Sequence, residues 1–416
     1  MKKNFYSPRM YAIITVLWFA HSALASSNYL TPIPSTGLMP VPAGGDEPFF
    51  GTYSPDSKFY ATAFFDTSGS PAVFSVNSTT GALTPITQTN PITPQETYGA
   101  VFSPFINGAY YVATSNFDPT VSVFSVNQDT GILTEVTGSP FTNPGASESY
   151  YSITYAPNGK WLAIPNSGGS SITTFEINQS TGVLFNGTAT PVTGLSANGP
   201  GAVAYSPDGR FMAIASYVDN NVLVCSVDQT TGVPSSTPVW TVPSAQHTWF
   251  IAYSPDGKWC AASSEEGSSN NLYLYSVDAT SGQLTSVTAN PYTLIGADSG
   301  SVAFSPDSTH LAVAGLAYPG YVFVFSISGS GAAGTLTQVA GSPFGTVDNE
   351  TYSVSFSSNN PCSSNNLWLA AVNEGSNSIS TFKVAYTPPS SCSNSYSNNL
   401  FAADLQAKYG PILAAQ

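Results

Sequence analysis

The chain has 416 residues, of which 8% are charged, and its formal net charge is −14. This negative charge makes nucleic acid and anionic membrane surfaces poor partners, because both repel an acidic protein. A hydrophobic share of 42% and an aromatic share of 13% are enough to fill a folded core, which excludes an intrinsically disordered chain. With so few charged residues, the surface should consist mainly of Ser, Thr, Asn and Gly.

Residues 1–25 have the pattern of a cleavable secretory signal peptide. A basic start with Lys2, Lys3 and Arg9 precedes an apolar stretch and then small residues at the expected cleavage site. The apolar stretch is shorter than a bilayer span requires, so a membrane anchor is the less favoured interpretation. Cleavage would change the net charge to −17, because the segment holds three basic residues and no acids. We therefore predict a secreted or periplasmic protein without a membrane span, with residues 26–34 as a loose lead-in.

A β-hairpin signature recurs along the rest of the chain. Its clearest copy is residues 205–211, in which Pro207, Asp208 and Gly209 favour a tight turn between two apolar strands. Successive copies are 48 to 53 residues apart, and a fixed period of this length predicts repeated structural units. The anchor residues of the copies are Ser54, Ser103, Ala156, Ser206, Ser254, Ser305 and Ser357.

Each unit also contains a third apolar strand, a Thr-Thr-Gly turn or a relative of it, and a fourth strand. Four antiparallel strands repeated seven times predict an all-β fold, the seven-bladed β-propeller. The seventh unit has no fourth strand downstream, and residues 35–42 match the pattern of that strand. We therefore predict that an N-terminal strand closes the last blade and leaves few exposed sheet edges. The propeller should occupy residues 35–386 and be followed by a C-terminal tail over residues 387–416.

These repeats resemble the YVTN and lactonase-type seven-bladed propellers, which include phosphogluconolactonases and carboxymuconate cyclases. The resemblance covers roughly residues 35 to 386, whereas WD40 propellers are less similar because the third strands lack a Trp-Asp ending. The resemblance implies a lactonase or cycloisomerase activity. Family members commonly carry Arg-His or His-Pro pairs at the start of inner strands. At those positions this chain has Tyr98-Gly99, Gly201-Ala202 and Gly300-Ser301.

The four cysteines fit an oxidising compartment. Cys362 and Cys392 should lie on the same face of the last blade, because blade strands alternate in direction, and we predict a disulfide between them. Cys225 and Cys260 lie on predicted strands. They are interpreted either as a second bridge or as two small buried side chains.

The loops between second and third strands define what we call the top face, and the Pro-Asp-Gly hairpins define the opposite turn face. In each unit, the residue seven positions before the anchor comes directly before the innermost strand. Together these seven residues should surround the mouth of the central channel. These rim residues are Glu47, Glu96, Ser149, Gly199, His247, Asp298 and Glu350, and Glu148 adjoins Ser149. Two positions further along the chain are the aromatic residues Phe49, Tyr98, Tyr151, Trp249 and Tyr352.

Carboxylates crowded at one rim suit a hard cation, while carboxylates beside aromatic rings suit a carbohydrate or a basic protein or peptide. Simple solvation of loops by acidic residues is the alternative. The chain has no dense Asp-x-Asp loop, so we predict no cofactor and keep calcium only as an alternative. The predicted ligand-binding set is Glu47, Glu96, Glu148, Asp298, Glu350, Tyr98, Tyr151, Trp249 and Tyr352.

The predicted top face has no Lys or Arg, which an enzyme acting on an anionic lactone would need. The residues therefore favour a monomeric, exported binding module. The alternative is a lactonase or cycloisomerase in which His247 is the acid or base, acting on a neutral substrate with Glu96, Glu350 or Asp298. His310 occupies a position that holds Trp in three other units, so we predict that it packs within its sheet.

Overall fold

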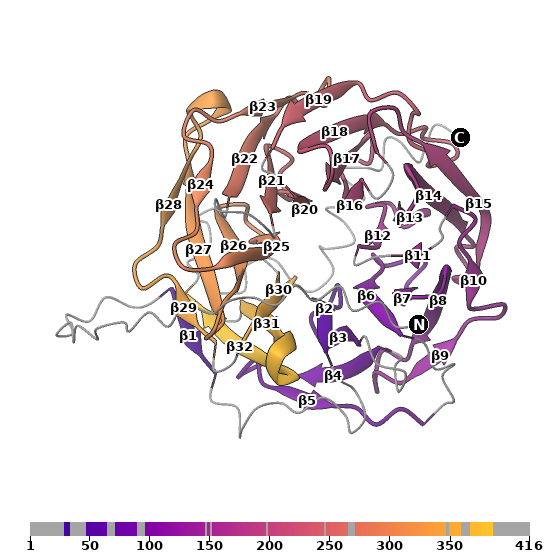
Figure 1. The fold of residues 1–416 in the computed structure, drawn as a ribbon. Coiled ribbons are helices and arrows are strands. Elements are labelled where there is room, and N and C mark those ends of the chain that lie inside the picture. The colour runs from indigo at the N-terminus through magenta and orange to yellow at the C-terminus, as the bar shows by residue number, and fades with distance from the viewer. Residues whose placement is uncertain are drawn as a thin grey trace, which may run out of the picture.

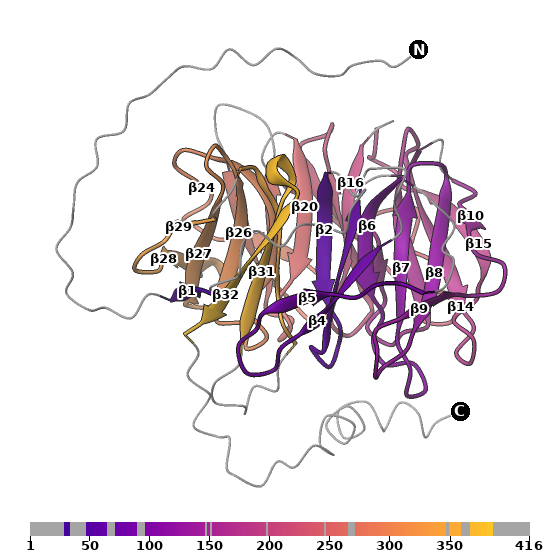
Figure 2. The same cartoon turned by 90° about the horizontal axis from the view of Figure 1, so that it is seen from below.

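Seven antiparallel sheets are arranged radially around a central axis in the computed structural model (Figure 1). This arrangement confirms the predicted seven-bladed propeller. Seen from the side, the sheets form a disc in which the strands run between the two faces (Figure 2). The structure describes residues 29–33, 47–64, 71–89, 96–145, 148–149, 152–196, 199–244, 247–264, 271–346, 349–358 and 367–385.

Several predicted features lie outside the described residues, namely the signal peptide, the segment 35–42, the Cys362 and Cys392 pair and the C-terminal tail. Within the described part of the chain, no helix is long and apolar enough to cross a bilayer.

The first four blades follow one another in chain order, each running from the axis outward. Blade 1 comprises β2 (Pro48–Tyr53), β3 (Phe59–Phe64), β4 (Ala72–Val76) and β5 (Leu83–Pro85). Blade 2 comprises β6 (Thr97–Phe102), β7 (Tyr111–Asn116), β8 (Thr120–Val126), β9 (Leu133–Glu135) and β10 (Phe141–Thr142). Blade 3 comprises β11 (Glu148–Ser149), β12 (Thr154–Tyr155), β13 (Trp161–Ser167), β14 (Ser171–Ile177) and β15 (Leu184–Pro191). Blade 4 comprises β16 (Pro200–Tyr205), β17 (Phe211–Ser216), β18 (Asn221–Ser226) and β19 (Trp240–Pro243).

The remaining three blades complete the ring. Blade 5 comprises β20 (Thr248–Tyr253), β21 (Trp259–Ser264), β22 (Asn271–Val277), β23 (Leu284–Ser286) and β24 (Tyr292–Thr293). Blade 6 comprises β25 (Asp298–Phe304), β26 (His310–Leu316), β27 (Tyr321–Ser328), the 3-10 helix η1 (Gly331–Ala333), β28 (Thr335–Gln338) and β29 (Phe344–Gly345). Blade 7 comprises β30 (Thr351–Phe356), β31 (Trp368–Asn373), the 3-10 helix η2 (Glu374–Ser376), β32 (Ser378–Val384) and the N-terminal strand β1 (Leu30–Pro32).

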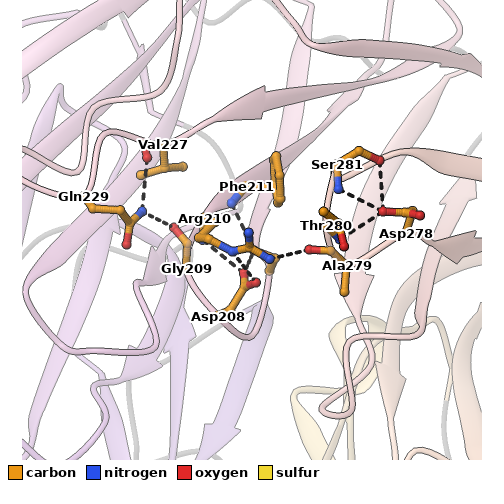
Figure 3. A network of polar contacts seen from close by, with 11 residues as sticks. Asp208, Gly209, Arg210, Phe211, Val227, Gln229, Asp278, Ala279, Thr280 and Ser281 are labelled. Atoms are coloured by element: carbon orange, nitrogen blue, oxygen red, sulfur yellow. Dashed lines mark hydrogen bonds and ion pairs between the residues drawn. The ribbon is translucent and has the colours of Figure 1, made fainter. Parts of the chain in front are cut away.

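The Pro-Asp-Gly hairpin is held by its own side chains. In blade 4 the Ser206 hydroxyl donates to Asp208 Oδ1 at 2.6 Å, and the backbone N–H of Phe211 donates to Ser206 Oγ at 3.0 Å. The Arg210 guanidinium bonds the Asp208 carboxylate and also donates to the backbone carbonyl of Ala279 in blade 5 (Figure 3). The same hydrogen bond from a serine hydroxyl to the aspartate two residues later recurs at Ser54, Ser254 and Ser305. The repeated serine anchor therefore stabilises the hairpin turn.

The turn before the fourth strand joins each blade to the one before it. In blade 4 the Asp228 carboxylate accepts the N–H groups of Thr230 and Thr231 at 2.7 and 3.0 Å. Gly232 then turns with φ at 73°, and a Cβ there would lie 2.2 Å from the Trp161 ring of blade 3. Gly232 is therefore required both for its backbone conformation and for contact with the neighbouring indole.

The same contact of glycine against an aromatic ring recurs around the disc. In each case the ring belongs to the first residue of the second strand in the preceding blade. The pairs are Gly81 with Trp368, Gly131 with Phe59, Gly182 with Tyr111, Gly232 with Trp161, Gly282 with Phe211 and Gly334 with Trp259. Together they cover six of the seven junctions between blades.

The seventh junction, between blades 6 and 7, uses a different pair. Tyr29 stacks on His310 with ring centroids 4.3 Å apart and an interplanar angle of 28°. His310 begins β26, in the position of the rings at the other junctions, and it contacts the neighbouring blade, whereas its place in the repeat led us to expect packing within its own sheet. Burial lowers the pKa of His310, while the nearby Asp307 carboxylate opposes that shift.

The N-terminal strand closes blade 7 as predicted, but it is not the predicted segment. It is β1, in which Leu30 pairs with Val384 and Thr31 with Lys383. The residues assigned to a loose lead-in thus include the closing strand. Its Leu-Thr-Pro sequence is identical to that of β5, a match that could have located it. Leu30 is buried in the core of blade 7, and Pro32 is tolerated because β1 is an edge strand.

Cys225 and Cys260 are both free and buried. Burial raises the pKa of the Cys225 thiol to about 11 and raises the pKa of the Cys260 thiol further. These two residues are therefore small apolar side chains of the core, and the interpretation as a second bridge does not hold.

The inter-blade glycine contact gives a direct stability test. Gly232→Ala should lower the free energy of unfolding by about 1–3 kcal/mol more than Gly108→Ala, because overpacking is added to the strained φ. Gly108 is the matched control, since its φ is 82° but no atom lies within 4 Å of the added Cβ. Chemical denaturation of both variants measures the difference, and equal losses would show that the Trp161 contact is unimportant.

The stack at the closing junction should make stability depend on pH. A folded-state pKa below the usual value means that the unfolded state binds more protons, so stability should fall as pH drops below about 6.5. His310→Phe keeps a ring against Tyr29 but cannot titrate. Unfolding free energies at about pH 7.5 and 5.5 should therefore change less for His310→Phe than for the wild type. An identical change in both proteins would contradict this role of His310.

Candidate functional site

Aromatic side chains of several blades meet at the axis beneath the top face. Phe49 contacts Tyr98 and Tyr352 at centroid distances of 5.9 and 5.0 Å. Phe50 of blade 1 contacts Phe250 of blade 5 at 5.4 Å, although these blades are not neighbours. The cluster therefore spans the axis. We call Phe49, Tyr98, Phe250 and Tyr352 the axial aromatic cluster, and Phe50, Trp249 and Leu316 pack against it.

Tyr98 and Tyr352 are only 4% and 3% exposed. They form a floor beneath the rim and offer little surface to a ligand, which differs from the ligand-binding role expected for them. Trp249 is half-buried and lies at the edge of the cluster. Its ring is accommodated by Gly201, where a Cβ would lie 3.0 Å from Trp249 Cε3.

Acidic residues of three consecutive blades lie at the start of inner strands that contribute to this floor. Glu47, Glu96 and Glu350 precede Phe49, Tyr98 and Tyr352 by two residues each, and all three are half-buried. Because the three rings pack together, the strands that carry these acids also converge at the top face. The structure thus brings together residues that are up to about 300 positions apart in sequence.

Both the backbone N–H and the backbone carbonyl of Glu350 form hydrogen bonds. Its N–H donates to the carbonyl of Ala317 in blade 6 at 2.9 Å, and its carbonyl accepts the N–H of Glu374 at 3.0 Å. A Cβ at Gly375 would lie 3.2 Å from Glu350 Oε2, which places that carboxylate against η2. Blade 7 therefore presents Glu350 beside the loop that carries Glu374.

The candidate base His247 lies across the axis, at the start of blade 5. Its ring stacks on Tyr217 of blade 4 at 4.5 Å, and Tyr217 also contacts Trp249 at 4.5 Å. Tyr217, which sequence reasoning did not single out, is thus the centre of a half-buried group of three rings. We call Tyr217, His247 and Trp249 the blade 4/5 aromatic group.

The repeat register could have identified Tyr217. Phe117, Tyr217 and Glu374 each follow the last residue of a second strand. Each also donates its backbone N–H to the carbonyl of a rim residue, Glu96, Gly199 or Glu350. Phe117 is 40% exposed and contacts Tyr98, so this second ring of positions also faces the rim.

The other predicted site residues are more dispersed or not described. Asp298 begins β25 and pairs with Leu316. Glu148 is placed in β11 by its backbone, and Tyr151 lies outside the described residues.

Burial would raise the pKa of Asp219, but hydrogen bonds from Ser196 and Ser216 outweigh it and hold the pKa below its usual value.

The basic side chains that the structure describes all lie at the turn face. Of the described basic residues, Lys58, Lys160, Arg210 and Lys258 follow hairpins of the turn face, and Lys383 pairs with Trp368 at the same end of its blade. Three of them form ion pairs with turn aspartates. The described part of the top face thus has acids without a basic residue.

No group of three or more His, Cys, Asp or Glu residues in the described ranges is arranged to hold a metal ion.

Two inner-strand glycines lie where a larger side chain would meet the neighbouring inner strand. A Cβ at Gly300 would lie 2.3 Å from the carbonyl oxygen of Tyr352, and one at Gly201 would lie 2.9 Å from that of Trp249. Neighbouring inner strands approach too closely there to admit any side chain. An anion-binding Arg or His therefore has no room at these positions.

Solved structures with the same architecture include enzymes and proteins of other function. A proposed 6-phosphogluconolactonase of Bacteroides fragilis has a TM-score of 0.57 and 22% identity, covering 73% of this chain and 85% of that one. The periplasmic gluconolactonase of Pseudomonas aeruginosa has a TM-score of 0.57 and 19% identity, covering 74% and 87%. Hydrazine synthase of Kuenenia stuttgartiensis also has a TM-score of 0.57, at 18% identity, covering 85% and 99%. At these identities the likeness shows the fold alone.

The sequence comparisons agree with the repeats. A search of curated proteins found no match to the chain. Residues 72–250 match the family described as lactonase, 7-bladed beta-propeller. The protein is thus a seven-bladed β-propeller, and residues 72–250, somewhat less than half of the chain, are similar to the lactonase-type propellers.

Proposed function

We propose that the protein is an exported lactonase that hydrolyses an uncharged lactone at the rim of the top face. The family match and the gluconolactonase among the structural relatives support this activity more than the binding module that the residues alone favoured. The observation that supports the proposal is the axial aromatic cluster, in which Phe49, Tyr98 and Tyr352 each lie two residues after a glutamate of the rim, namely Glu47, Glu96 or Glu350.

The distribution of charge favours an uncharged substrate. Phosphorylated or carboxylated lactones require a guanidinium or ammonium partner, and no basic residue is present on the described top face. A neutral sugar lactone has an apolar ring face that can lie against the half-buried rings of Tyr217 and Trp249. Its hydroxyl groups can donate hydrogen bonds to the rim carboxylates.

Hydrolysis needs a base to activate water and an acid to protonate the leaving oxygen. In the proposed reaction, His247 or a rim carboxylate takes a proton from water while the hydroxide adds to the lactone carbonyl. The ring C–O bond then breaks, and the proton is returned to the departing alkoxide. The product is a hydroxy acid, and its carboxylate is repelled by the acidic rim, which favours release.

A second candidate function, carbohydrate binding without turnover, is favoured by the blade 4/5 aromatic group. Tyr217 stacks on His247 and makes a tilted contact with Trp249, all three rings are half-buried, and Val218 beside them is 44% exposed. Rings presented in this way suit the apolar face of a sugar. The adjacent Asp219 remains ionised because of its serine hydrogen bonds.

The proposed activity can be tested on matched panels of neutral and anionic lactones. Purified protein should hydrolyse neutral members and not phosphorylated ones. His247→Gln and Glu350→Gln should each lower kcat/KM by about 10²–10⁴-fold, because each removes an acid or base. Glu176→Gln is the control, since Glu176 is bonded to Asn186 near the turn-face end of blade 3. Absence of turnover with every lactone, or unchanged rates in both rim variants, would reject the proposal.

The binding alternative makes a separate prediction. Tyr217→Ala and Trp249→Ala should each weaken the binding of neutral oligosaccharides by roughly tenfold or more, because each removes a stacking surface. Calorimetric titration measures this effect, and Phe185→Ala on the outer strand β15 serves as an exposed aromatic control. Binding without any lactone turnover would favour this second function over the first.

A further inference from the structure

We infer that Asn377 and Asn220 are positioning residues of the rim. Each fixes the backbone of one candidate functional residue, Glu47 or His247, in a left-handed conformation that the fold itself does not require. The functional part of this inference rests on the proposed activity. The structural part, namely which residue imposes the conformation, does not.

Three rim residues have an unusual backbone. Glu47, His247 and Glu350 have φ values of 56°, 54° and 51°, a region that side chains other than Gly, Asn and Asp rarely occupy. Strained backbone of this kind clusters at functional sites, where the surrounding structure has to enforce it. These three are also the His and two of the Glu residues that the proposed reaction uses.

The propeller architecture does not demand this conformation. Glu96, Gly199 and Asp298 occupy the same position in blades 2, 4 and 6, and none of them has a positive φ. Gly199 is the residue that could adopt it at no steric cost, and it does not. The left-handed backbone therefore occurs at Glu47, His247 and Glu350 for a reason other than the turn itself.

A side chain of the preceding blade accounts for two of the three. The N–H of Glu47 donates to Asn377 Oδ1 at 2.7 Å, across the junction of blades 7 and 1. The N–H of His247 donates to Asn220 Oδ1 at 3.2 Å, across the junction of blades 4 and 5. For Glu350 the acceptor is instead the Ala317 carbonyl at 2.9 Å.

Both asparagines are firmly placed. Asn377 and Asn220 are themselves left-handed, with φ of 51° and 55°, and each immediately precedes a third strand, β32 or β18. Asparagine tolerates this conformation better than most residues. The loop before Asn220 is held by the Asp219 carboxylate, which bonds Ser196 and Ser216. Each amide oxygen is thus a fixed acceptor, and the rim N–H must point toward it.

The left-handed backbone changes the direction in which the side chains of Glu47 and His247 leave the main chain. Turning the rim backbone into the left-handed region reorients the Cα–Cβ bond, so the asparagine determines where the Glu47 or His247 side chain points. The two asparagines touch the backbone of the candidate residues and act through them. A matched comparison exists within the chain, because Asn186 is also left-handed, with φ of 51°, but bonds Glu176 on an outer strand.

The structural part is tested by a thermodynamic cycle that needs no substrate. At a left-handed position Gly is more stable than Ala, so Glu47→Gly should melt a few degrees above Glu47→Ala. If Asn377 imposes the conformation, this gap should shrink by at least half when both variants also carry Asn377→Ala, because the backbone can then relax. An unchanged gap in the Asn377→Ala background would overturn the inference, whatever the protein's activity.

The functional part is tested at His247. Only three histidines occur in the chain, so the His247 ring resonance can be assigned with His247→Gln and compared between variants by NMR. Asn220→Ala should move that resonance and lower kcat/KM for a neutral lactone about tenfold, while Asn220→Asp, which keeps an oxygen acceptor, should restore most of the kcat/KM. Asn186→Ala should change neither.

The outcomes of the two tests are separable. A wild type that hydrolyses no lactone would reject the proposed function but leave the melting and NMR measurements decisive for the asparagines. An Asn220→Ala protein with the wild-type His247 ring resonance and wild-type kcat/KM would reject the positioning role while leaving the lactonase proposal intact.

Discussion

The contact of a glycine turn against the aromatic ring of the preceding blade is the interaction on which the ring depends. It occurs at six junctions, and Tyr29 stacked on His310 replaces it at the seventh. Each contact needs a large flat ring on one blade and a turn without a side chain on the next. These six contacts, together with the stack at the seventh junction, fix the angle between neighbouring blades, so the ring closes and the inner strands meet at one axis.

Closure of the ring brings the aromatic residues and the acidic candidate residues of several blades to the top face. The axial aromatic cluster lies beneath the rim, and acidic residues of blades 7, 1 and 2 precede three of its rings by two positions. The basic residues that the structure describes lie at the turn face, where Lys58, Arg210 and Lys258 pair with aspartates of the hairpins. The described part of the rim therefore repels anions, which is the electrostatic basis for proposing an uncharged substrate.

The same close packing limits what the site can contain. Gly201 and Gly300 lie where the neighbouring inner strand passes within contact distance, so a basic side chain has no room there. The functional groups are instead on the rim loops, whose backbones are fixed by the preceding blade. The shared fold sets the positions, and the residues at those positions determine the chemistry.

The period of the repeat, the hairpin chemistry and the alternation of strands are local properties, so the sequence alone determined the seven-bladed fold, the two faces and the list of rim positions. It could also have located β1 through the Leu-Thr-Pro match with β5. Only the tertiary structure decided that Tyr98 and Tyr352 are buried, that Tyr217 stacks on His247, and that Glu47 is held by Asn377. These facts depend on contacts between different blades, including one between residues 330 positions apart, and no local pattern encodes such distances.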